Sequence, residues 1–322
     1  MNEYLSVRNL TVEYVTSEET VYAVNDVSFS MEKGRTLGLV GETGAGKTTI
    51  ARSIMRILPV PPAVVKNGEI FLNGRDLMKL SKKEMYAVRG DEVSMIFQDP
   101  MTSLNPTMHV GDQIAEVILH HESVSKAEAR KKAETMLEMV GIPKERYDEF
   151  PHQFSGGMKQ RVVIAIALAC DPDVLIADEP TTALDVTIQA QVLEMMRDLR
   201  NKKNMSLILI THDLGVVAEM CDDVAVVYGG EIVERGTLAH IFKNPSHPYT
   251  IGLFGAIPDL ESDRERLTPI KGQPINPAEK VVGCKFRERC PYATEACGKG
   301  AIPDLEIEPG HFSKCLYKRK EG

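Results

Sequence analysis

The sequence lacks any apolar run long enough to cross a lipid bilayer. Its most apolar stretch, Val162 to Cys170, is flanked by charged residues and falls far short of the roughly 20 residues that a membrane-spanning helix requires. The N-terminal residues also lack a basic segment followed by an apolar one, so we expect no secretory signal. These absences favour a soluble chain that resides in the cytosol.

An excess of positive charge is absent as well. The chain has a formal net charge of -8 and a sequence pI near 5.6, whereas nucleic-acid-binding proteins normally present a basic face to the phosphate backbone. We therefore expect no nucleic-acid partner. With 322 residues, 43% of them hydrophobic and 26% charged, the chain can bury a full core and is long for one ordinary domain. This favours one large domain with a smaller appendage.

Disulfide bonds are not expected from the six cysteines, because a reducing cytosol keeps thiols free. Cys170 and Cys221 stand alone in apolar helical patterns and are predicted to pack in the core. The others follow the spacing Cys-x5-Cys-x6-Cys-x17-Cys: Cys284, Cys290, Cys297 and Cys315. Four thiolates can hold tetrahedral zinc or an iron–sulfur cluster. Structural zinc sites usually contain close Cys-x2-4-Cys pairs, which are missing here, so the spacing favours an iron–sulfur cluster over zinc or unliganded thiols.

A glycine-rich loop joins a buried strand predicted from Arg35 to Val40 to a helical pattern from Thr49 to Leu58. The loop matches the phosphate-loop motif in its required strand–loop–helix context: Gly41, Glu42, Thr43, Gly44, Ala45, Gly46, Lys47 and Thr48. Glycines let successive backbone N–H groups approach phosphate oxygens, and the helix N-terminus adds partial positive charge. Lys47 is predicted to contact the β and γ phosphates and Thr48 to coordinate Mg²⁺.

Two adjacent acids, Asp178 and Glu179, follow the apolar run from Val174 to Ala177. An acid at the carboxyl end of a parallel strand, near a phosphate loop, can hold Mg²⁺ through its water shell. Glu179 can then polarise the attacking water as general base. Taken alone, such a pair is more often a solvated turn, but the phosphate loop favours the functional interpretation.

Two further polar residues follow predicted buried strands. His212 comes after the run from Ser206 to Ile210 and is a candidate for contacting the γ-phosphate, although in isolation a loop histidine is the better interpretation. Gln98 comes after the run from Val93 to Phe97, and its uncharged side chain suits Mg²⁺ and the attacking water. Spacing alone supports the second assignment only weakly.

A second glycine-rich segment, Phe154 to Arg161, lies just before a predicted helix from Val162 to Ala169. Serine and glycine at a helix start form another anion site, which suggests a nucleotide shared between two chains. With these motifs, the chain resembles the ATPase subunit of an ATP-binding cassette (ABC) transporter from about Tyr14 to Gly236. The resemblance implies an α/β P-loop NTPase of the ABC ATPase type, with a RecA-like core, an N-terminal antiparallel β layer and a helical subdomain.

The same resemblance implies roles for individual residues. It matches Gln98 to the Q-loop glutamine, Glu179 to the catalytic glutamate and His212 to the switch histidine. The magnesium ligands would be Thr48, Gln98 and Asp178. The residues that bind ATP would be Gly41 to Thr49 and Tyr14. Tyr14 would stack on adenine, and the nearby Tyr22 is an alternative for this role.

Two such domains are expected to dimerise head to tail. The resemblance then implies that Ser155, Gly156 and Gly157 contact the ATP of the partner, and that Asp185 belongs to the D-loop Ala183-Leu184-Asp185. The signature departs from the family pattern at Phe154 and Met158, where leucine and glutamine are usual. Because the serine and both glycines are present, phosphate binding is still expected, but Met158 cannot supply an amide contact.

Residues 1–245 are predicted to form the nucleotide-binding domain, with the helical subdomain inserted at about 100–155. Asn73-Gly74 predicts a hairpin turn, and Ser125 with Glu128 predicts a capping box at the start of a helix that runs to Val140. The resemblance implies that the loop Asp99 to Pro106 faces a transmembrane partner, whereas without it an ordinary surface loop is an equally good interpretation. Residues 246–322 are predicted to form a small irregular C-terminal extension that carries a metal cluster.

The segment Asn244 to Thr250 resembles the C-terminal extension of dipeptide and oligopeptide importer ATPases. Some subunits of that kind carry a [4Fe-4S] cluster at such cysteine positions. The resemblance to them strengthens the prediction of a cluster here, with Zn²⁺ as the alternative. We expect the cluster to be structural, because the extension has little apolar sequence with which to build its own core.

These features predict an ATP-hydrolysing subunit that powers import of dipeptides or oligopeptides from the cytoplasmic face of the cell membrane. The expected partners are a second ABC ATPase subunit, either a paralogue or the same chain, two transmembrane permease subunits and, indirectly, an extracytoplasmic peptide-binding protein. Importers of nickel complexes or glutathione remain alternatives. A soluble ABC ATPase is disfavoured because there is no second cassette, coiled-coil insertion or basic face, and an iron–sulfur redox protein is disfavoured because ATPase motifs occupy most of the chain.

Overall fold

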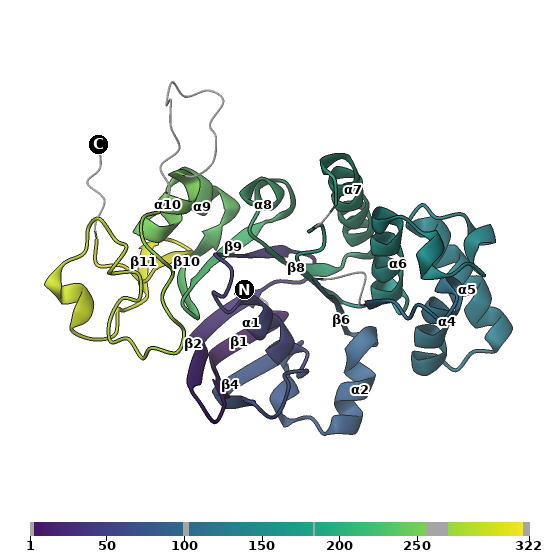
Figure 1. Cartoon of the computed structure of the whole chain (residues 1–322), viewed down its shortest axis with the longest axis horizontal. Coiled ribbons are helices and arrows are strands. Elements are labelled where there is room, and N and C mark those ends of the chain that lie inside the picture. The colour runs from purple at the N-terminus through teal and green to yellow at the C-terminus, as the bar shows by residue number, and fades with distance from the viewer. Residues whose placement is uncertain (1–2, 99–102, 183, 256–269, 318–322) are drawn as a thin grey trace.

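The computed structural model describes residues 3–98, 103–182, 184–255 and 270–317. Within this part of the chain, a small antiparallel sheet packs beside a large mixed sheet, and helices surround the large sheet (Figure 1). No helix in the described ranges is both long and apolar enough to span a membrane.

The small sheet has the strand order β2-β1-β4-β5 and confirms the predicted N-terminal antiparallel layer. Its strands are β1 (Leu5–Val15), β2 (Thr20–Met31), β4 (Ala63–Leu72) and β5 (Arg75–Asp76). The turn between β4 and β5 consists of Asn73 and Gly74, with φ of 47° and 77°. Positive φ at both central residues is what a tight hairpin of this type requires, so the predicted turn is confirmed.

The large sheet has the order β11-β12-β10-β9-β3-β8-β7-β6 in the described ranges. It contains β3 (Thr36–Val40), β6 (Val93–Ile96), β7 (Val174–Asp178), β8 (Ser206–Thr211), β9 (Asp223–Tyr228), β10 (Glu231–Thr237), β11 (Leu305–Glu308) and β12 (His311–Ser313). The strands from β9 to β6 are parallel and are buried on both faces, which explains their continuous apolar sequences. Residues that follow β3, β6, β7 and β8 therefore meet at one edge.

The α-helices of the described ranges are α1 (Lys47–Ile54), α2 (Lys82–Asp91), α4 (Val110–His121), α5 (Lys126–Met139), α6 (Gly156–Leu168), α7 (Val186–Lys203), α8 (Leu214–Met220), α9 (Leu238–Lys243) and α10 (Pro248–Gly255). Short 3-10 turns occur at Leu77–Lys79, Lys144–Arg146, Pro151–Gln153 and Glu295–Gly298. Ser125 and Glu128 form the predicted capping box at the start of α5. Figure 1 shows α4 and α5 at one end of the molecule and the yellow C-terminal segment at the other.

The large sheet separates two apolar clusters. One lies between the small sheet, α1 and one face of the large sheet, and includes Leu39, Ile50 and Ile70. The other lies on the opposite face and extends through the helical region into the C-terminal extension, where Tyr249 and Phe286 are buried. The extension therefore shares the apolar core of the ATPase domain.

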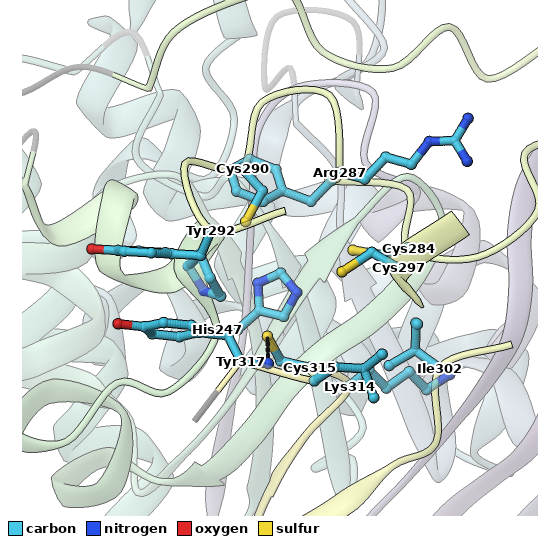
Figure 2. A pocket seen from close by; sticks show the side chains of 13 residues that line it. His247, Cys284, Arg287, Cys290, Tyr292, Cys297, Ile302, Lys314, Cys315 and Tyr317 are labelled. Carbon is cyan, nitrogen blue, oxygen red and sulfur yellow. Dashed lines mark hydrogen bonds between the residues drawn. The ribbon is translucent and has the colours of Figure 1, made fainter. Parts of the chain in front are cut away.

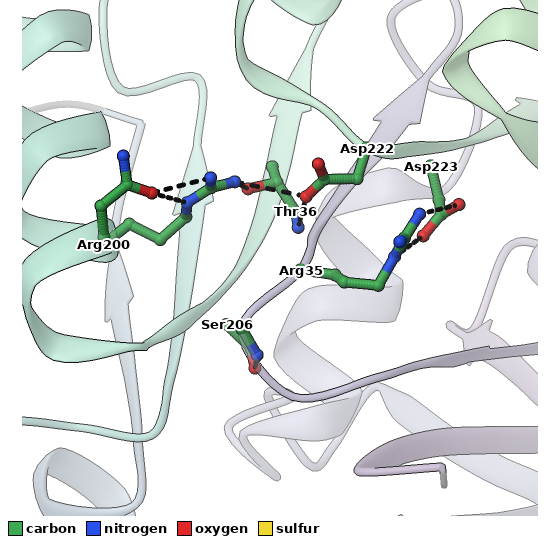
Figure 3. A network of polar contacts seen from close by, with 8 residues as sticks. Arg35, Thr36, Arg200, Ser206, Asp222 and Asp223 are labelled. Carbon is green, nitrogen blue, oxygen red and sulfur yellow. Dashed lines mark hydrogen bonds and ion pairs between the residues drawn. The ribbon is translucent and has the colours of Figure 1, made fainter. Parts of the chain in front are cut away.

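A polar network fixes the amino ends of the central strands (Figure 3). At the start of β3, the Thr36 backbone N–H donates to Asp222 Oδ2 over 2.7 Å, and Arg35 makes a paired contact with Asp223 over 2.7 and 2.8 Å. Arg200 of α7 donates to the Thr36 hydroxyl over 2.6 Å. These contacts hold the start of β3 in register with the start of β9. They therefore fix the strand from which the phosphate loop extends.

Three structural predictions differ from the observed fold. The helix predicted from Thr49 to Leu58 is α1, which begins earlier, at Lys47, and ends earlier, at Ile54. α6 begins at Gly156 rather than near Val162, because Ser155 is already its N-cap and accepts the backbone N–H of Met158 over 3.4 Å. The prediction of an irregular extension is wrong at α10 (Pro248–Gly255) and at residues 305–313, where β11 and β12 form a hairpin and β12 pairs with β10. An unpaired edge at β10 would leave backbone N–H and C=O groups without partners, and this hairpin satisfies them.

Candidate active site

The phosphate loop lies between β3 and α1, at the carboxyl edge of the parallel strands. Two of its glycines allow close backbone approaches. A Cβ on Gly41 would lie 2.1 Å from the Val227 carbonyl oxygen, and a Cβ on Gly46 would lie 2.4 Å from the Ala23 carbonyl oxygen. Gly46 also has φ of 106°, in the region that favours glycine. The glycines therefore fix the path of the loop over the N-terminus of α1.

Lys47, the first residue of α1, is folded back over the phosphate loop. Its Nζ donates to the carbonyl oxygens of Gly41 over 2.6 Å and Glu42 over 3.0 Å, and only 6% of the residue is exposed. Burial lowers the pKa of Lys47, although nearby carboxylates oppose this effect. A buried ammonium whose partners among the described residues are carbonyl oxygens is well placed to exchange them for phosphate oxygens.

Thr48 and Asp178 meet at the predicted magnesium site. The Thr48 hydroxyl donates to Asp178 Oδ1 over 3.1 Å. Asp178 is the last residue of β7 and is 2% exposed, and this burial raises the pKa of its carboxyl group. A hydroxyl and a carboxylate supply the oxygen ligands that Mg²⁺ prefers, so the residues present suit this cation.

Glu179 lies at the centre of a hydrogen-bond network. Its Oε2 accepts from Gln98 Nε2 and from the Thr182 hydroxyl, each over 3.0 Å, and its Oε1 lies 3.3 Å from Nδ1 of His212. Burial opposes ionisation, but the contacts with Thr182, His212 and Gln98 outweigh it and hold the pKa of Glu179 below its usual value. Glu179 is therefore an ionised carboxylate in a fixed position, which is what a general base requires.

The backbone at Glu179 is unusual. Its φ of 49° is in the left-handed region, which is costly for a glutamate. The Thr182 N–H donates to the Glu179 carbonyl oxygen over 3.2 Å and closes a turn at this point. Thr182 was not predicted from the sequence. Its position three residues after Glu179, in this turn, is the signal that could have identified it.

Tyr14 and Tyr22 lie on the paired strands β1 and β2, and both are half-buried. The Tyr14 hydroxyl is 3.3 Å from the Thr49 hydroxyl, which places Tyr14 beside the phosphate-loop helix. The Tyr22 backbone N–H donates to the carbonyl oxygen of Pro277 in the extension over 2.8 Å. Both residues remain candidates for stacking on adenine.

The signature residues lie at the start of α6, which Figure 1 shows well apart from α1. A Cβ on Gly157 would lie 2.5 Å from the Ile188 side chain, so this glycine permits close packing against α7. A Cβ on Gly156 would meet no described atom within 4 Å. The N-cap of α7 is Asp185, which accepts the Ile188 N–H over 3.1 Å, and Ala183 of the predicted D-loop lies outside the described residues.

The four C-terminal cysteines line one pocket together with His247 (Figure 2). Burial raises the pKa of Cys284 and of Cys315 to about 11 in each case, and the nearby cysteine sulfurs add to the effect. Hydrogen bonds with the Thr294 backbone and side chain lower the pKa of Cys297. The stacked rings of Tyr292 and Tyr317 lie beside the pocket, 4.1 Å apart. His247 was not among the predicted site residues, although it lies in the segment Asn244 to Thr250 that resembles peptide-importer subunits.

Comparison with known proteins assigns the chain to a family. A family model described as "ABC transporter" matches residues 24–182, and a model described as "Oligopeptide/dipeptide transporter, C-terminal region" matches residues 233–297. The oligopeptide transport ATP-binding protein OppD of Bacillus subtilis is 52% identical over 313 residues, which cover 96% of this chain and 87% of that protein. The chain belongs to the ABC transporter family.

Other members of the ABC transporter family show similar agreement. The dipeptide transport ATP-binding protein DppD of Bacillus subtilis is 53% identical over 301 residues, covering 93% of this chain and 90% of that protein. Among solved structures, a dimeric ATP-binding cassette in a post-hydrolysis state, bound to ADP and phosphate, matches with a TM-score of 0.66 and 26% identity. That match covers 73% of this chain and 98% of the solved chain. The ABC ATPase fold predicted from the sequence is thereby confirmed.

Proposed function

We propose that this chain is the ATP-hydrolysing subunit of an ABC importer for dipeptides or oligopeptides. The observation that carries the proposal is the carboxylate of Glu179, which is ionised and hydrogen-bonded to Gln98, beside a phosphate loop that bears a buried Lys47. The substrate class is supported by relatives that are named oligopeptide and dipeptide transport ATP-binding proteins and that match nearly the whole chain.

In the proposed reaction, Lys47 and the backbone N–H groups of the phosphate loop bind the β and γ phosphates. Glu179 accepts a proton from the attacking water while Gln98 and Thr182 keep its carboxylate oriented. His212 stands on the other side of this carboxylate and is available to the γ-phosphate. When bound by Thr48, Asp178 and Gln98, Mg²⁺ would neutralise charge on the phosphate oxygens.

The signature residues are proposed to act on a second nucleotide. Ser155, Gly156 and Gly157 lie at the start of α6, and Figure 1 shows α6 well apart from α1, the helix that follows the phosphate loop. Gly156 faces open space among the described residues. A partner's ATP would approach this helix N-terminus. The dimeric state of the similar solved cassette supports this arrangement, and Asp185 is proposed to lie at the dimer contact.

The remaining partners follow from the importer assignment. We propose a second ABC ATPase subunit, two permease subunits and, indirectly, an extracytoplasmic peptide-binding protein, with this chain held peripherally at the cytoplasmic face. The contact to the permeases would lie in the loop after Gln98, of which residues 99–102 are outside the described ranges. Residues 1–245 would form the nucleotide-binding domain and residues 246–322 the extension.

We also propose a [4Fe-4S] cluster in the cysteine pocket, and His247 provides the first support. His247 is 1% exposed, and burial lowers its pKa to about 4, so the imidazole is neutral at pH 7. The Tyr249 N–H donates to Nδ1 of His247 over 3.1 Å, which leaves the proton on Nε2. No described residue accepts a hydrogen bond from this Nε2, which lines the pocket. Such an unpaired donor suits an anionic sulfide or thiolate group.

The spacing of the thiols provides the second support. Four Zn–S bonds of about 2.3 Å place the sulfurs of a tetrahedral site about 3.8 Å apart. Among the described residues, one set of three His, Cys, Asp or Glu side chains has ligand atoms within 4.8 Å of one another, and it consists of His240, Glu308 and His311. No three of the described cysteine sulfurs are therefore that close together. Wider thiol spacing suits a multinuclear cluster better than zinc, and the cluster would contribute to folding of the extension.

The function is tested by reconstituting the chain with its permeases and measuring ATP hydrolysis with and without peptide plus binding protein. Peptide-stimulated hydrolysis is expected. Stimulation by a nickel complex or glutathione alone would overturn the substrate class, and hydrolysis indifferent to the permeases would overturn the importer assignment. For the extension, anaerobic purification followed by iron, sulfide and zinc analysis should give iron and sulfide, whereas zinc alone would overturn the cluster.

A further inference from the structure

Glu42, the second residue of the phosphate loop, is held by two side chains from the C-terminal extension. Arg289 donates to both carboxylate oxygens, from Nη1 to Oε2 over 2.6 Å and from Nη2 to Oε1 over 2.9 Å. The Tyr249 hydroxyl accepts the backbone N–H of Glu42 over 2.9 Å. The side chain and the backbone of Glu42 are therefore both fixed by residues more than 200 positions away in sequence, at separations of 247 and 207.

Arg289 is a rigid donor in this contact. Only 6% of its side chain is exposed, against 28% for Glu42. Its guanidinium carbon lies 5.7 Å from the ring centroid of Tyr228 and 5.8 Å from that of Phe286, and its Nε donates to the Lys271 carbonyl oxygen over 3.2 Å. A paired arginine–carboxylate contact in such surroundings defines both distance and orientation.

Tyr249 is equally constrained. It is fully buried, and its ring packs 4.6 Å from Tyr228 and 5.4 Å from Phe286, measured between ring centroids. The start of α10, which carries Tyr249, is fixed by Glu234, whose carboxylate accepts the N–H groups of Ser246 over 2.7 Å and His247 over 2.8 Å. The hydroxyl that meets Glu42 is thus anchored in the sheet.

The contact continues from Glu42 to the phosphate-binding lysine. The Gly41 carbonyl oxygen, which shares a peptide unit with the Glu42 N–H, accepts from Lys47 Nζ over 2.6 Å, so one peptide unit connects the extension to Lys47. The Glu42 carbonyl oxygen accepts from the same Nζ over 3.0 Å. Because its N–H is directed to Tyr249, the Glu42 backbone has a defined orientation before any nucleotide binds. A shift of this backbone would move the carbonyl oxygens that hold Lys47, the residue proposed to bind the phosphates.

We propose that Arg289 and Tyr249 are positioning residues for the phosphate loop, so that the affinity of this subunit for Mg-ATP depends on the C-terminal extension. The inference rests on the proposed ATPase function and adds a role for the extension in it. The cysteine-lined loop from Cys284 to Cys290 carries both Phe286 and Arg289. Any change that displaces this loop would therefore also weaken the contact between Arg289 and the Glu42 carboxylate.

A tether that merely fastens the extension to the ATPase domain makes a different prediction. Loss of a tether would lower the stability of the extension and leave the affinity for ATP unchanged. Arg235 offers a matched control, because it pairs with Asp304 and so links β10 to the extension without contacting the phosphate loop. The guanidinium carbon of Arg235 also lies 4.0 Å from the ring centroid of Phe312. Arg289 has comparable but longer contacts with aromatic rings.

The experiment measures the Kd for Mg-ATP of the full-length chain, with kcat, KM, melting temperature and metal content recorded for each variant. R289Q and E42Q are each expected to raise Kd and KM by about 10- to 100-fold, the factor that loss of a hydrogen bond to a charged group corresponds to, with kcat at saturating ATP changed less than about threefold because Glu179 is untouched. Y249F should shift Kd in the same direction. The Kd of the R289Q/E42Q double variant should not exceed that of the single variant that binds ATP more weakly, because both substitutions remove the same contact. R235Q should bind ATP as the wild type does.

The outcomes separate the proposals. Wild-type Kd values in both R289Q and E42Q, additive effects in the double variant, or equal losses in R235Q would overturn the positioning role. If R289Q does not fold, E42Q and Y249F still decide the question, because neither removes an arginine from the extension. A wild-type chain that fails to bind Mg-ATP at all would instead refute the proposed ATPase function.

Discussion

Replacement of Glu179 by glutamine should slow ATP hydrolysis strongly and leave ATP binding intact. The two side chains have the same shape, and the carboxylate uses Oε2 for Gln98 and Thr182 and Oε1 for His212. A glutamine can keep its oxygen towards Gln98 and Thr182 and donate from its amide group to Nδ1 of His212. The local structure should therefore survive, while the ionised base is lost.

The size of the effect follows from the role of the base. Positioned general bases contribute about 10²- to 10⁴-fold to a rate, so kcat should fall by that factor, or about 3–5 kcal/mol in the barrier. Only 13% of the Glu179 side chain is exposed, so a solvent base has little access to replace it. Phosphate release by the reconstituted complex measures kcat, and a fluorescent ATP analogue measures Kd.

The aspartate variant is the matched control for Glu179. E179D keeps the negative charge, but its side chain is one methylene shorter, so the carboxylate lies farther from the attacking water. Its kcat should therefore lie between those of the wild type and E179Q. If E179Q hydrolysed ATP within about threefold of the wild-type rate while binding ATP normally, Glu179 would not be the base, and Asp178 would be the next candidate.

Three other perturbations address the phosphate site, the core of the extension and its pH dependence. K47A should lower kcat/KM by about 10²- to 10³-fold, because it removes a buried donor to the phosphates; steady-state kinetics with an unchanged kcat/KM would contradict this. F286A should cost about 3–5 kcal/mol by leaving a cavity at a residue that is 2% exposed, with F286L recovering most of the loss in denaturant titrations. Burial opposes protonation of His311, but Glu234 and Glu308 outweigh it and raise its pKa above 6.5. Its ion-pair stabilisation is therefore fully present below about pH 6.5 and is lost as pH rises through the higher folded pKa. The difference in melting temperature between wild type and H311Q should accordingly shrink from about pH 6 to pH 9, and a difference that grew over this range would refute the assignment.

Local interactions explain which parts of the fold could be predicted. The hairpin at Asn73-Gly74 and the capping box at Ser125 depend on residues within a few positions of each other, and both are found. The parallel strands were predictable because burial on both faces makes their sequences continuously apolar. The start of α6 at Gly156 was missed, because glycines disfavour helices while the Ser155 cap and its packing against α7 stabilise this one.

The sequence by itself determined the phosphate loop, the acids that follow β7 and the identity of the clustered cysteines, because each is a pattern of residue types at fixed short spacing. Only the tertiary structure decided the partners of these groups. The contact between Arg289 and Glu42 joins residues 247 positions apart, and His247 reaches the cysteine pocket from a different segment. Such pairs are selected by the packing of the whole core, in which a buried polar group must find a partner wherever the chain brings one, and no local spacing encodes that choice.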